Sequence, residues 1–444
     1  MKLVRKLILV FSVVALLAGF ECILNASCSL EAYPVQKRIT ILDNTEQPPE
    51  EPTEPAPDPE PAPEPEPEEP KELTLLVYMA ADNDLESYAI KNLKAMERAN
   101  FSNTNVLVLL DRSEEYDETN DNWTDSRLFE VCHDNTNGSS IISKRVSCAP
   151  LGLSQIATTE LDMGDYTVLK AFIEFGKTNY EAKKYALILW GHGTGWRYSR
   201  AVAIDDKSHS YMGVKDLGLA LKNQSLSVIG FDTCFGSVFE NLYELKDCTQ
   251  YIAACPGLSP ASGWNYTMLL ETLDTSDFSE DTIVNTISLS APANITITQT
   301  SALTGLFTKI ENFSQALAQT ITDETTRRQV FDILLNTKSY SYTQYPCDLY
   351  LDIFSMAEQF SLNENPLLSQ AAAELKNEVS TKQIGLHFIS KTGSGVLAAV
   401  HSEDYLKNDN NNSQCAFIKE SDWWVPTSNK KSKSVLDKLF YTNF

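Results

Sequence analysis

Basic residues are scarce in this sequence. Its 444 residues include 36 lysines and arginines against 60 aspartates and glutamates, so the formal net charge at pH 7 is −24. Non-specific nucleic-acid binding depends on basic patches that contact phosphates, so this composition argues against a nucleic-acid partner. The chain is nevertheless 43% hydrophobic, which is enough for a sizeable core, and its length allows two or three domains.

Several patterns that mark particular chemistries are also missing. The nine cysteines contain no Cys-x-x-Cys pair, and the five histidines form no cluster with zinc-ligand spacing. The sequence has no Gly-x-Ser-x-Gly elbow, no phosphate-binding loop and no His-Glu-x-x-His motif. No calcium-loop pattern is evident either. These absences argue against a structural zinc site and leave the chemistry to residues outside such motifs.

The first 28 residues have the pattern of an export signal. A positively charged start precedes a nearly all-apolar run at 7–20, which is short for a membrane span. Residues 25–27 (Asn-Ala-Ser) precede Cys28, as at the cleavage site of bacterial lipoproteins, although leucine is more usual at position 25. The sequence predicts an exported protein: a lipoprotein of the cell surface or outer membrane tethered through Cys28, a secreted protein, or one with an uncleaved anchor.

Residues 29–72 are expected to form a disordered linker. The part at 46–72 reads EQPPEEPTEPAPDPEPAPEPEPEEPKE, with eleven acidic residues and one lysine. Proline removes backbone donors and the like charges repel each other, so this segment should be an extended, solvated spacer. It could hold a domain away from a surface, or it could be an ordinary linker.

The folded part is predicted to start with a strand–helix–strand unit. LTLLVYMA at 73–80 and NVLVLLD at 105–111 read as buried strands, and 81–101 has apolar residues at helical spacing. Residues 112–160 are polar and broken, and Cys132 and Cys148 could close a loop there in an exported protein. A long amphipathic helix is predicted over 163–185.

Two apolar runs end in chemically capable residues. YALILW leads into His192, and LSVIGFDT leads into Cys234, with a helical pattern at 212–223 between them. The two strands should therefore be parallel, and both residues should lie at the sheet edge where ligands bind. Asp232 points to the same face as Cys234 by the two-residue period of a strand. A carboxylate there could bind a basic substrate side chain or cap the following helix.

A thiol and an imidazole at one sheet edge are the parts of a cysteine nucleophile with its base. A helix predicted over 235–248 would lower the thiol pKa through its amino-terminal field. Glycines flank His192, and the Gly193 amide could donate to an oxyanion. The alternatives are a structural histidine at a strand end and an inert buried cysteine.

The remainder of the chain is predicted to mix helices and strands, with no internal repeat. A strand at 251–255 is followed by a Gly/Pro-rich loop that could line the site. The predicted helices cover 281–290, 301–321, 327–337 and 347–360, and the predicted strands cover 381–390 and 395–402. This part is either a second subdomain or an extension of the first sheet.

The segments LTLLVYMAADNDLE, MGDYTVLKAFIEF, YALILWGHGTGW, AIDDKSHSYMGVKDLGLAL and IGFDTCFGSVFENLYEL resemble the clostripain family of cysteine peptidases in order and spacing. CDLYLDIFSMA and CAFIKESDWW extend this resemblance over roughly 73–425. It implies an α/β fold, a caspase-like sandwich with a mostly parallel sheet flanked by helices. The implied domains are a catalytic core at 73–265 and a C-terminal α/β extension at 266–444.

The resemblance also implies roles for individual residues. His192 is the dyad histidine, Cys234 is the nucleophile, and Asp232 matches an acidic residue of a pocket for basic P1 side chains. Family members favour cleavage after arginine or lysine, and some cleave themselves between the histidine and the cysteine. Cleavage after Lys207, in an expected exposed loop, would fit this self-activation, but Lys207 is equally an ordinary loop lysine. Cys255–Pro256 stands where the family usually carries Ser-Glu, and this alters a wall of the expected pocket.

The sequence therefore predicts an exported cysteine endopeptidase that acts as a monomer on protein or peptide substrates. No cofactor is required by the residues, although the family resemblance allows calcium. A membrane is expected as a partner only through the lipid anchor. The alternatives are a catalytically inactive surface binding protein on a peptidase scaffold, and another hydrolase or transferase with the same dyad.

Overall fold

The structure is a computed structural model that describes residues 69–195, 202–292, 294–340, 350–381 and 396–398. The chain divides into one unit at residues 1–66 and a second at 67–444, and every described residue belongs to the second. The predicted export signal, Cys28 and nearly all of the predicted linker lie outside the described residues. In the part of the chain that is described, no helix is both long and apolar enough to span a bilayer.

Within the described residues, eight strands form one mixed sheet in the order β10-β9-β8-β5-β1-β2-β3-β4. Its centre is parallel, and the strands there are nearly continuous apolar runs, as expected for strands buried on both faces. The parallel strands are β1 (Lys71–Ala81), β2 (Thr104–Arg112), β5 (Ala182–Trp190), β8 (Leu226–Asp232) and β9 (Thr249–Ala254). Antiparallel strands complete both edges: β10 (Thr296–Gln299) on one side, β3 (Ser126–Glu130) and β4 (Lys144–Val146) on the other.

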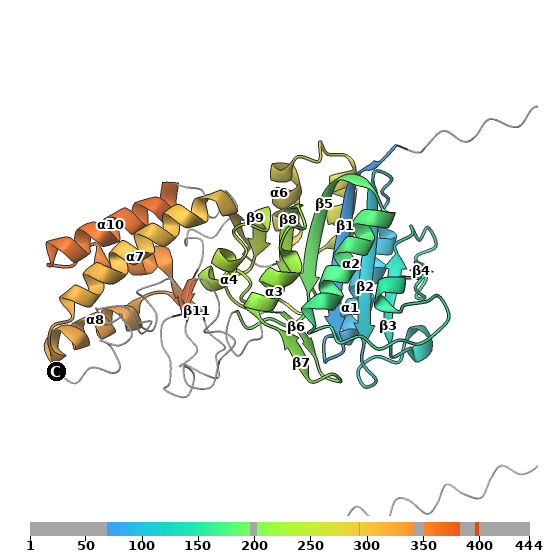
Figure 1. The fold of residues 1–444 in the computed structure, drawn as a ribbon, viewed down its shortest axis with the longest axis horizontal. Helices are drawn as coiled ribbons and strands as arrows, with labels where there is room; N and C mark the ends of the chain where they lie inside the picture. Colours follow the sequence, from blue (N-terminus) through green and yellow to red (C-terminus); the bar gives the residue numbers. More distant parts are fainter. Residues whose placement is uncertain (1–68, 196–201, 293, 341–349, 382–395, 399–444) are drawn as a thin grey trace, which may run out of the picture. The chain divides into compact units, whose positions relative to one another are not determined.

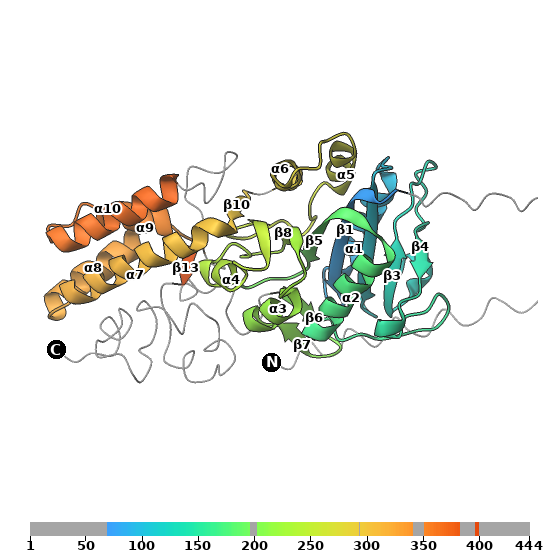
Figure 2. The ribbon, with the colours of Figure 1, turned by 45° about the horizontal axis from the view of Figure 1, so that its top comes forward.

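Helices cover both faces of this sheet, with a hydrophobic core on each side (Figure 1, Figure 2). Side chains alternate along a strand, so β1 contributes to both cores. Its odd-numbered residues from Leu73 to Met79 pack with α1 (Glu86–Arg98), α5 (Tyr266–Asp274) and α6 (Glu280–Ser290). Its even-numbered residues from Leu76 to Ala80 pack with α2 (Tyr166–Asn179), α3 (Val214–Leu221) and α4 (Phe239–Glu244).

The C-terminal part adds four helices among the described residues and a small antiparallel sheet. The helices are α7 (Leu303–Thr320), α8 (Glu324–Asn336), α9 (Ile353–Phe360) and α10 (Pro366–Thr381), and the strands are β11 (Ser339–Tyr340), β12 (Tyr350–Asp352) and β13 (Val396–Ala398). Tyr243 of α4 stacks on Phe307 of α7 with ring centroids 4.6 Å apart, so the second core continues into these helices. β10 extends the main sheet, whereas β11–β13 form a separate one.

The predicted strands at 73–80, 105–111 and 251–255 are confirmed, as are the helices at 281–290, 301–321 and 327–337. Three predicted helices were too long. The one at 163–185 ends at Asn179, because residues from Ala182 onward pair with β1. Of 235–248 only α4 is an α-helix, and of 347–360 the helix starts at Ile353, where the Asp352 carboxylate caps it by accepting from Ser355 N.

Several elements were not predicted. A hairpin of β6 (Val202–Asp205) and β7 (Ser210–Met212) occupies what reads as a polar linker, and α5 and β10 were missed. Three 3₁₀ turns were also missed: η1 (Asn120–Asn122), η2 (Ala149–Leu151) and η4 (Thr300–Ala302). The predicted strand at 381–390 lies almost entirely outside the described residues, and β13 falls within the one at 395–402.

The Cys132–Cys148 disulfide considered from the sequence is wrong, because both thiols are free. Cys148 is fully buried in the core beside Leu151, whereas Cys132 follows β3 and its thiol donates to Glu130 O at 3.6 Å. The two side chains therefore lie in different surroundings.

Candidate active site

The register of two neighbouring parallel strands places His192 and Cys234 at the same level. Trp190 at the end of β5 pairs with Asp232 at the end of β8, and His192 and Cys234 each follow two residues later. Gly191 N donates to Asp232 O at 3.4 Å, which carries the pairing one step past the strand end. The predicted strand–helix–strand unit and its parallel pairing are confirmed, so both side chains leave the sheet at its carboxyl edge.

The two loops touch at Gly193. A Cβ atom built at this position would lie 2.4 Å from Cys234 O and 2.8 Å from Thr233 Oγ1. No side chain fits at those distances, so glycine is what allows the loop after β5 to lie against the loop after β8. The histidine loop is supported from its other side by Tyr350 of β12, whose hydroxyl donates to Thr194 O at 2.6 Å.

Cys234 sits in a tight turn rather than at the start of a helix. Phe235 has φ +54°, in the left-handed region that is unfavourable for non-glycine residues, and α4 begins only at Phe239. The expectation that a helix terminus lowers the thiol pKa is therefore wrong. Burial raises the pKa of the Cys234 thiol, the Asp232 carboxylate adds to the increase, and the bond from Ser259 N at 3.3 Å opposes it.

The segment at 255–259 forms a wall beside the thiol. Phe235 N donates to Gly257 O at 2.8 Å and Ser237 N donates to Cys255 O at 3.1 Å, which fastens this segment to the turn that carries Cys234. The altered Cys255–Pro256 pair therefore lies next to the candidate nucleophile, as its place in the sequence led us to expect. Burial raises the pKa of the Cys255 thiol to about 11, so this second thiol stays neutral.

His192 has a partner that the sequence did not reveal. Its Nε2 lies 2.6 Å from Asp84 Oδ1, in the turn after β1, and its side chain is 37% exposed. Among the described residues no hydrogen bond joins His192 to Cys234. When Nε2 donates to Asp84, the neutral ring leaves Nδ1 as its acceptor, which is the tautomer needed to take a proton from a thiol. An acidic residue three positions after a strand end was the only sequence signal for this contact.

We expect Asp84→Ala to lower kcat roughly fivefold with little change in KM, because Asp84 positions His192 through an exposed hydrogen bond and exposed contacts of this kind contribute little. Steady-state kinetics over a pH series would test this. Glu118→Ala removes the same charge from another exposed position and should leave kcat unchanged. Equal kcat values in the Asp84 variant and the wild type would show that the ion pair does not position the histidine.

Asp232 is held by two aromatic residues: Trp264 in the loop that precedes α5, and Tyr266, the first residue of α5. Its Oδ2 accepts from Trp264 N at 3.0 Å and from Tyr266 Oη at 2.8 Å. Both described bonds go to Trp264 and Tyr266, and α4 has no side-chain cap, so Asp232 does not cap α4. Burial raises the pKa of Asp232 to about 7, although the two hydrogen bonds oppose the increase. Its Oδ1 receives no hydrogen bond from the described residues.

Asn92 of α1 anchors the same loop. Its side-chain nitrogen donates to Ser262 O at 2.8 Å, and its oxygen accepts from Trp190 Nε1 at 2.8 Å. A Cβ atom at Gly263, where φ is +67°, would lie 2.1 Å from the Asn92 oxygen and 2.9 Å from Asp232 Oδ2. The end of β5, the helix α1 and the carboxylate of Asp232 are thereby fixed to one another.

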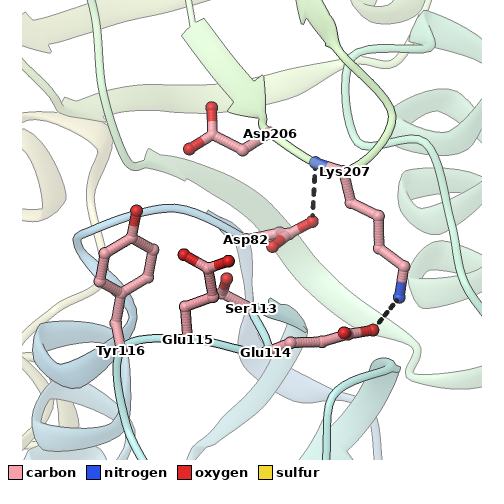
Figure 3. Close-up of a pocket in the computed structure, with 7 residues that line it drawn as sticks. All are labelled: Asp82, Ser113, Glu114, Glu115, Tyr116, Asp206 and Lys207. Carbon is pink, nitrogen blue, oxygen red and sulfur yellow. Dashed lines mark hydrogen bonds and ion pairs between the residues drawn. The ribbon is translucent and has the colours of Figure 1, made fainter.

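Lys207 lies in the turn between β6 and β7, where an exposed loop was expected, and its side chain is 42% exposed. Carboxylates contact both its side chain and its backbone. Its Nζ lies 3.0 Å from Glu114 and 3.1 Å from Glu160, and its backbone N donates to Asp82 Oδ2 at 3.1 Å. Figure 3 shows Lys207 with Asp82 and Glu114 around an acidic pocket of about 280 Å³. No pattern in the sequence indicates these contacts.

Comparison with known proteins identifies the family. The model of the clostripain family matches residues 77–433, which is most of the chain. The chain belongs to the clostripain family. It is 31% identical to clostripain from Hathewaya histolytica over 199 residues, a match that covers 40% of this chain and 36% of that protein. The chain thus spans about a third of this curated relative.

Solved structures show the same fold. An inactive zymogen of a C11 protease from Parabacteroides distasonis aligns with a TM-score of 0.56 at 19% identity, covering 79% of this chain and 98% of that one. A secreted C11 cysteine protease from Bacteroides thetaiotaomicron, solved with an irreversible peptide inhibitor, aligns with a TM-score of 0.54 at 17% identity, covering 80% and 99%. The predicted caspase-like architecture, with a mostly parallel sheet flanked by helices, is confirmed. Clostripain-family membership supports a cysteine endopeptidase.

Proposed function

We propose that this chain is an exported cysteine endopeptidase with Cys234 as nucleophile and His192 as base. The main support for this proposal is that the strand register and the Gly193 contact bring these residues into adjoining loops at one sheet edge. Family membership gives independent support for a peptidase. Proteins or peptides are the proposed substrates, and the proposed active form is a monomer.

In the proposed reaction the Cys234 thiol gives its proton to His192 Nδ1 as the sulfur attacks the scissile carbonyl. His192 then protonates the leaving amine, which releases the first product and leaves a thioester on Cys234. Water, deprotonated by His192, hydrolyses the thioester. The raised pKa of the Cys234 thiol means that the resting site holds a neutral thiol and that the base is needed for attack.

The backbone N–H groups of Gly193 and Cys234 are the proposed donors to the oxyanion that forms during attack. Both residues lie in the turns that meet at the sheet edge, and the close packing of Gly193 on Cys234 O fixes one turn relative to the other. Donors held in place before the reaction stabilise developing charge without reorganisation.

Asp232 is the proposed partner of an arginine or lysine at P1. Its carboxylate lies two residues before the nucleophile, is held by Trp264 and Tyr266, and keeps Oδ1 for a cation. A cationic P1 side chain would supply a positive charge to pair with the negative charge of the buried carboxylate. Since Cys255–Pro256 replaces the usual Ser-Glu pair, Asp232 would carry the preference for a basic residue with less help from that wall.

We expect the preference for basic P1 residues to depend on pH. The pKa of Asp232 is about 7, so its carboxyl group is neutral below that pH and ionised above it. The ratio of kcat/KM for a lysine substrate to kcat/KM for a matched glutamine substrate should fall as the pH drops through about 7. This ratio removes the ionisation of Cys234 and His192, which affects both substrates equally.

Asp232→Asn should abolish this pH dependence and lower the lysine-to-glutamine ratio by roughly 100-fold, which corresponds to a charge-assisted hydrogen bond in a buried site. Fluorogenic peptides that differ only at P1 provide the measurement, with and without calcium. A ratio in the Asn variant equal to that of the wild type would overturn the role of Asp232 and leave the dyad standing.

Lys207 is the proposed point of self-processing, and Cys28 the proposed point of lipid attachment. Support for Lys207 comes from its exposed turn between His192 and Cys234 in the sequence. Support for Cys28 comes from the sequence pattern alone. Recovery of the Cys28→Ala protein from the membrane fraction in the same amount as the wild type would exclude lipidation at Cys28.

A further inference from the structure

Leu258 is a half-exposed apolar side chain in the 255–259 segment, beside the proposed nucleophile. Its neighbours Cys255, Pro256 and Gly257 are buried, whereas Leu258 is 50% exposed. Single exposed leucines are common on protein surfaces, so exposure by itself assigns no role. The position of Leu258 relative to the Cys234 thiol distinguishes it from other exposed leucines.

One hydrogen bond fixes how far Leu258 lies from the thiol. Ser259 N donates to Cys234 Sγ at 3.3 Å, and Leu258 directly precedes Ser259. Standard peptide bond lengths therefore place the Leu258 Cα no more than about 6 Å from the sulfur. An extended peptide advances about 3.3–3.6 Å per residue. A leucine side chain at this position can reach a residue next to the carbonyl that Cys234 attacks.

The backbone around Leu258 is held from several directions. Phe235 N donates to Gly257 O at 2.8 Å, and the Cys255 thiol donates to Leu258 O at 3.5 Å. A Cβ atom built at Gly257 would lie 2.9 Å from Tyr340 Cδ1, so this ring of β11 lies against the segment. Leu258 is therefore presented by a backbone that is in place before a substrate binds, which lowers the entropic cost of binding.

The order of the strands decides which half of a substrate Leu258 faces. β8, which leads to Cys234, lies between β5 and β9 in the sheet. His192 follows β5 and the 255–259 segment follows β9, so they lie on opposite sides of Cys234. Because His192 protonates the leaving amine in the proposed mechanism, the P1′ residue lies on the histidine side. The acyl half of the substrate, with P1 and P2, then lies on the side of Leu258.

Asp232 separates the place of P1 from that of P2. Phe231 pairs with Ala254, so the 255–259 segment starts level with Asp232 and ends at the Cys234 thiol. A P1 side chain that runs from the scissile carbonyl to Asp232 would follow the buried part of this segment. The exposed side chain of Leu258, at the outer end, is left for the next residue of the substrate, P2.

We propose that Leu258 forms the apolar side of the P2 subsite and makes the enzyme prefer apolar P2 residues. This inference rests on the proposed function, because it takes Cys234 as the nucleophile, and it adds a second specificity position to it. An apolar P2 side chain would cover the exposed part of Leu258 and remove apolar surface of both from water. A polar P2 side chain would lose hydration against the leucine without gaining a hydrogen bond.

The test uses internally quenched peptides that carry leucine or asparagine at P2, with P1 fixed at the residue that the wild type cleaves fastest. The kcat/KM ratio of the leucine to the asparagine peptide should be roughly 10 in the wild type and about 1–2 in Leu258→Ala, since one methylene in an apolar pocket can discriminate tenfold. Leu367→Ala is the matched control, because Leu367 on α10 is 51% exposed, and it should keep the wild-type ratio. A ratio within one variant cancels changes in the folded fraction and in the dyad.

Leu258→Asp provides a second measurement that damage to the fold cannot imitate. The kcat/KM ratio of a P2 arginine peptide to the P2 leucine peptide should rise roughly tenfold above that of the wild type, because an apolar contact is lost and a charge attraction is gained. Equal P2 ratios in the wild type and Leu258→Ala, or an effect confined to peptides varied at P1′, would overturn the role of Leu258 and leave the peptidase standing. A wild type that cleaves no peptide would overturn the proposed function and this inference with it.

Discussion

Cys234→Ala should lower kcat/KM toward a susceptible peptide by about 10⁴-fold or more, with Tm close to that of the wild type. The proposed mechanism forms a covalent thioester, and removal of a nucleophile leaves only the contribution of binding and oxyanion donors. The small Ala side chain fits the turn before Phe235 without disturbing the bonds of Phe235 N and Ser237 N to the 255–259 segment. Turnover of fluorogenic peptides and a thermal melt provide the two measurements.

Cys132→Ala is the matched control, because Cys132 is also a partly exposed free thiol but lies after β3. It should retain full activity. A thiol-reactive peptide ketone should label the wild type at Cys234 with one equivalent and fail to label Cys234→Ala. Activity of the Cys234 variant near that of the wild type would remove the nucleophile assignment and favour the surface binding protein. Mass spectrometry of fragments found only with the active protein would show whether a cut follows Lys207.

Gly193→Ala should lower kcat/KM by roughly 100-fold and destabilise the fold by about 1–3 kcal/mol. The added methyl group would lie 2.4 Å from Cys234 O, so the two loops must separate. Overpacking of this kind typically has that cost in stability, and a displacement of about 1 Å between reacting groups reduces rates by about 100-fold. Urea unfolding and peptide turnover measure the two effects.

Gly138→Ala serves as its control, because this loop glycine has ordinary φ and the nearest atom to an added Cβ is a side-chain oxygen at 3.3 Å. It should change activity and stability little. If Gly193→Ala lost stability but kept full activity, the loop contact would be structural and the proposed oxyanion donor would have to lie elsewhere.

The sequence predicted the strand–helix–strand unit and its parallel pairing, because the signals there are local. Apolar runs lead to His192 and Cys234 with a helical pattern between them, and this order favours two parallel neighbouring strands. The contacts that refine the chemistry come from distant segments. Asp84 reaches His192 across 108 positions, and Ser259 reaches Cys234 across 25.

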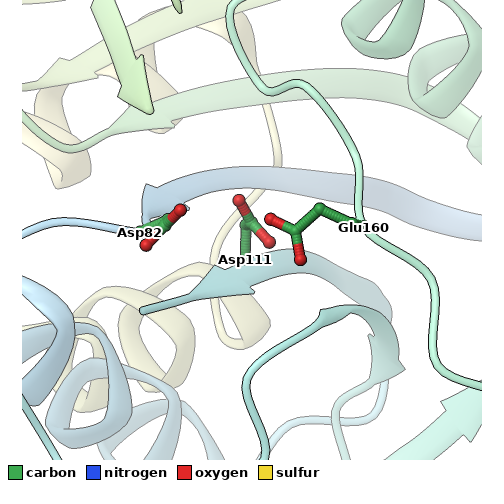
Figure 4. Close-up of side chains that lie close together, drawn as sticks. All are labelled: Asp82, Asp111 and Glu160. Atoms are coloured by element: carbon green, nitrogen blue, oxygen red, sulfur yellow. The ribbon is translucent and has the colours of Figure 1, made fainter. Parts of the chain in front are cut away.

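The predicted helix boundaries were wrong for a related reason. The amphipathic spacing continues past Asn179, but residues from Ala182 onward pair with β1 and are therefore a strand. It also continues past Cys234, but backbone hydrogen bonds to Cys255 and Gly257 hold the residues after Cys234 in a turn. Local pattern does not contain those tertiary bonds. The cluster of Asp82, Asp111 and Glu160, whose carboxylate oxygens lie within 4.8 Å of one another (Figure 4), could not be predicted for the same reason. Its members are spread over nearly eighty positions and share no motif.

Tyr350 supports the loops that carry His192 and Cys234, and it is synthesised after both of them. A growing chain contains His192 and Cys234 long before it contains the tyrosine whose hydroxyl holds Thr194 O and whose ring packs on Phe235 with centroids 5.3 Å apart. At about 5–20 residues per second, the ribosome needs several further seconds to add it. Until then the loops that carry the histidine and the cysteine lack this support. A prematurely terminated product would therefore be released without the contacts that support both loops.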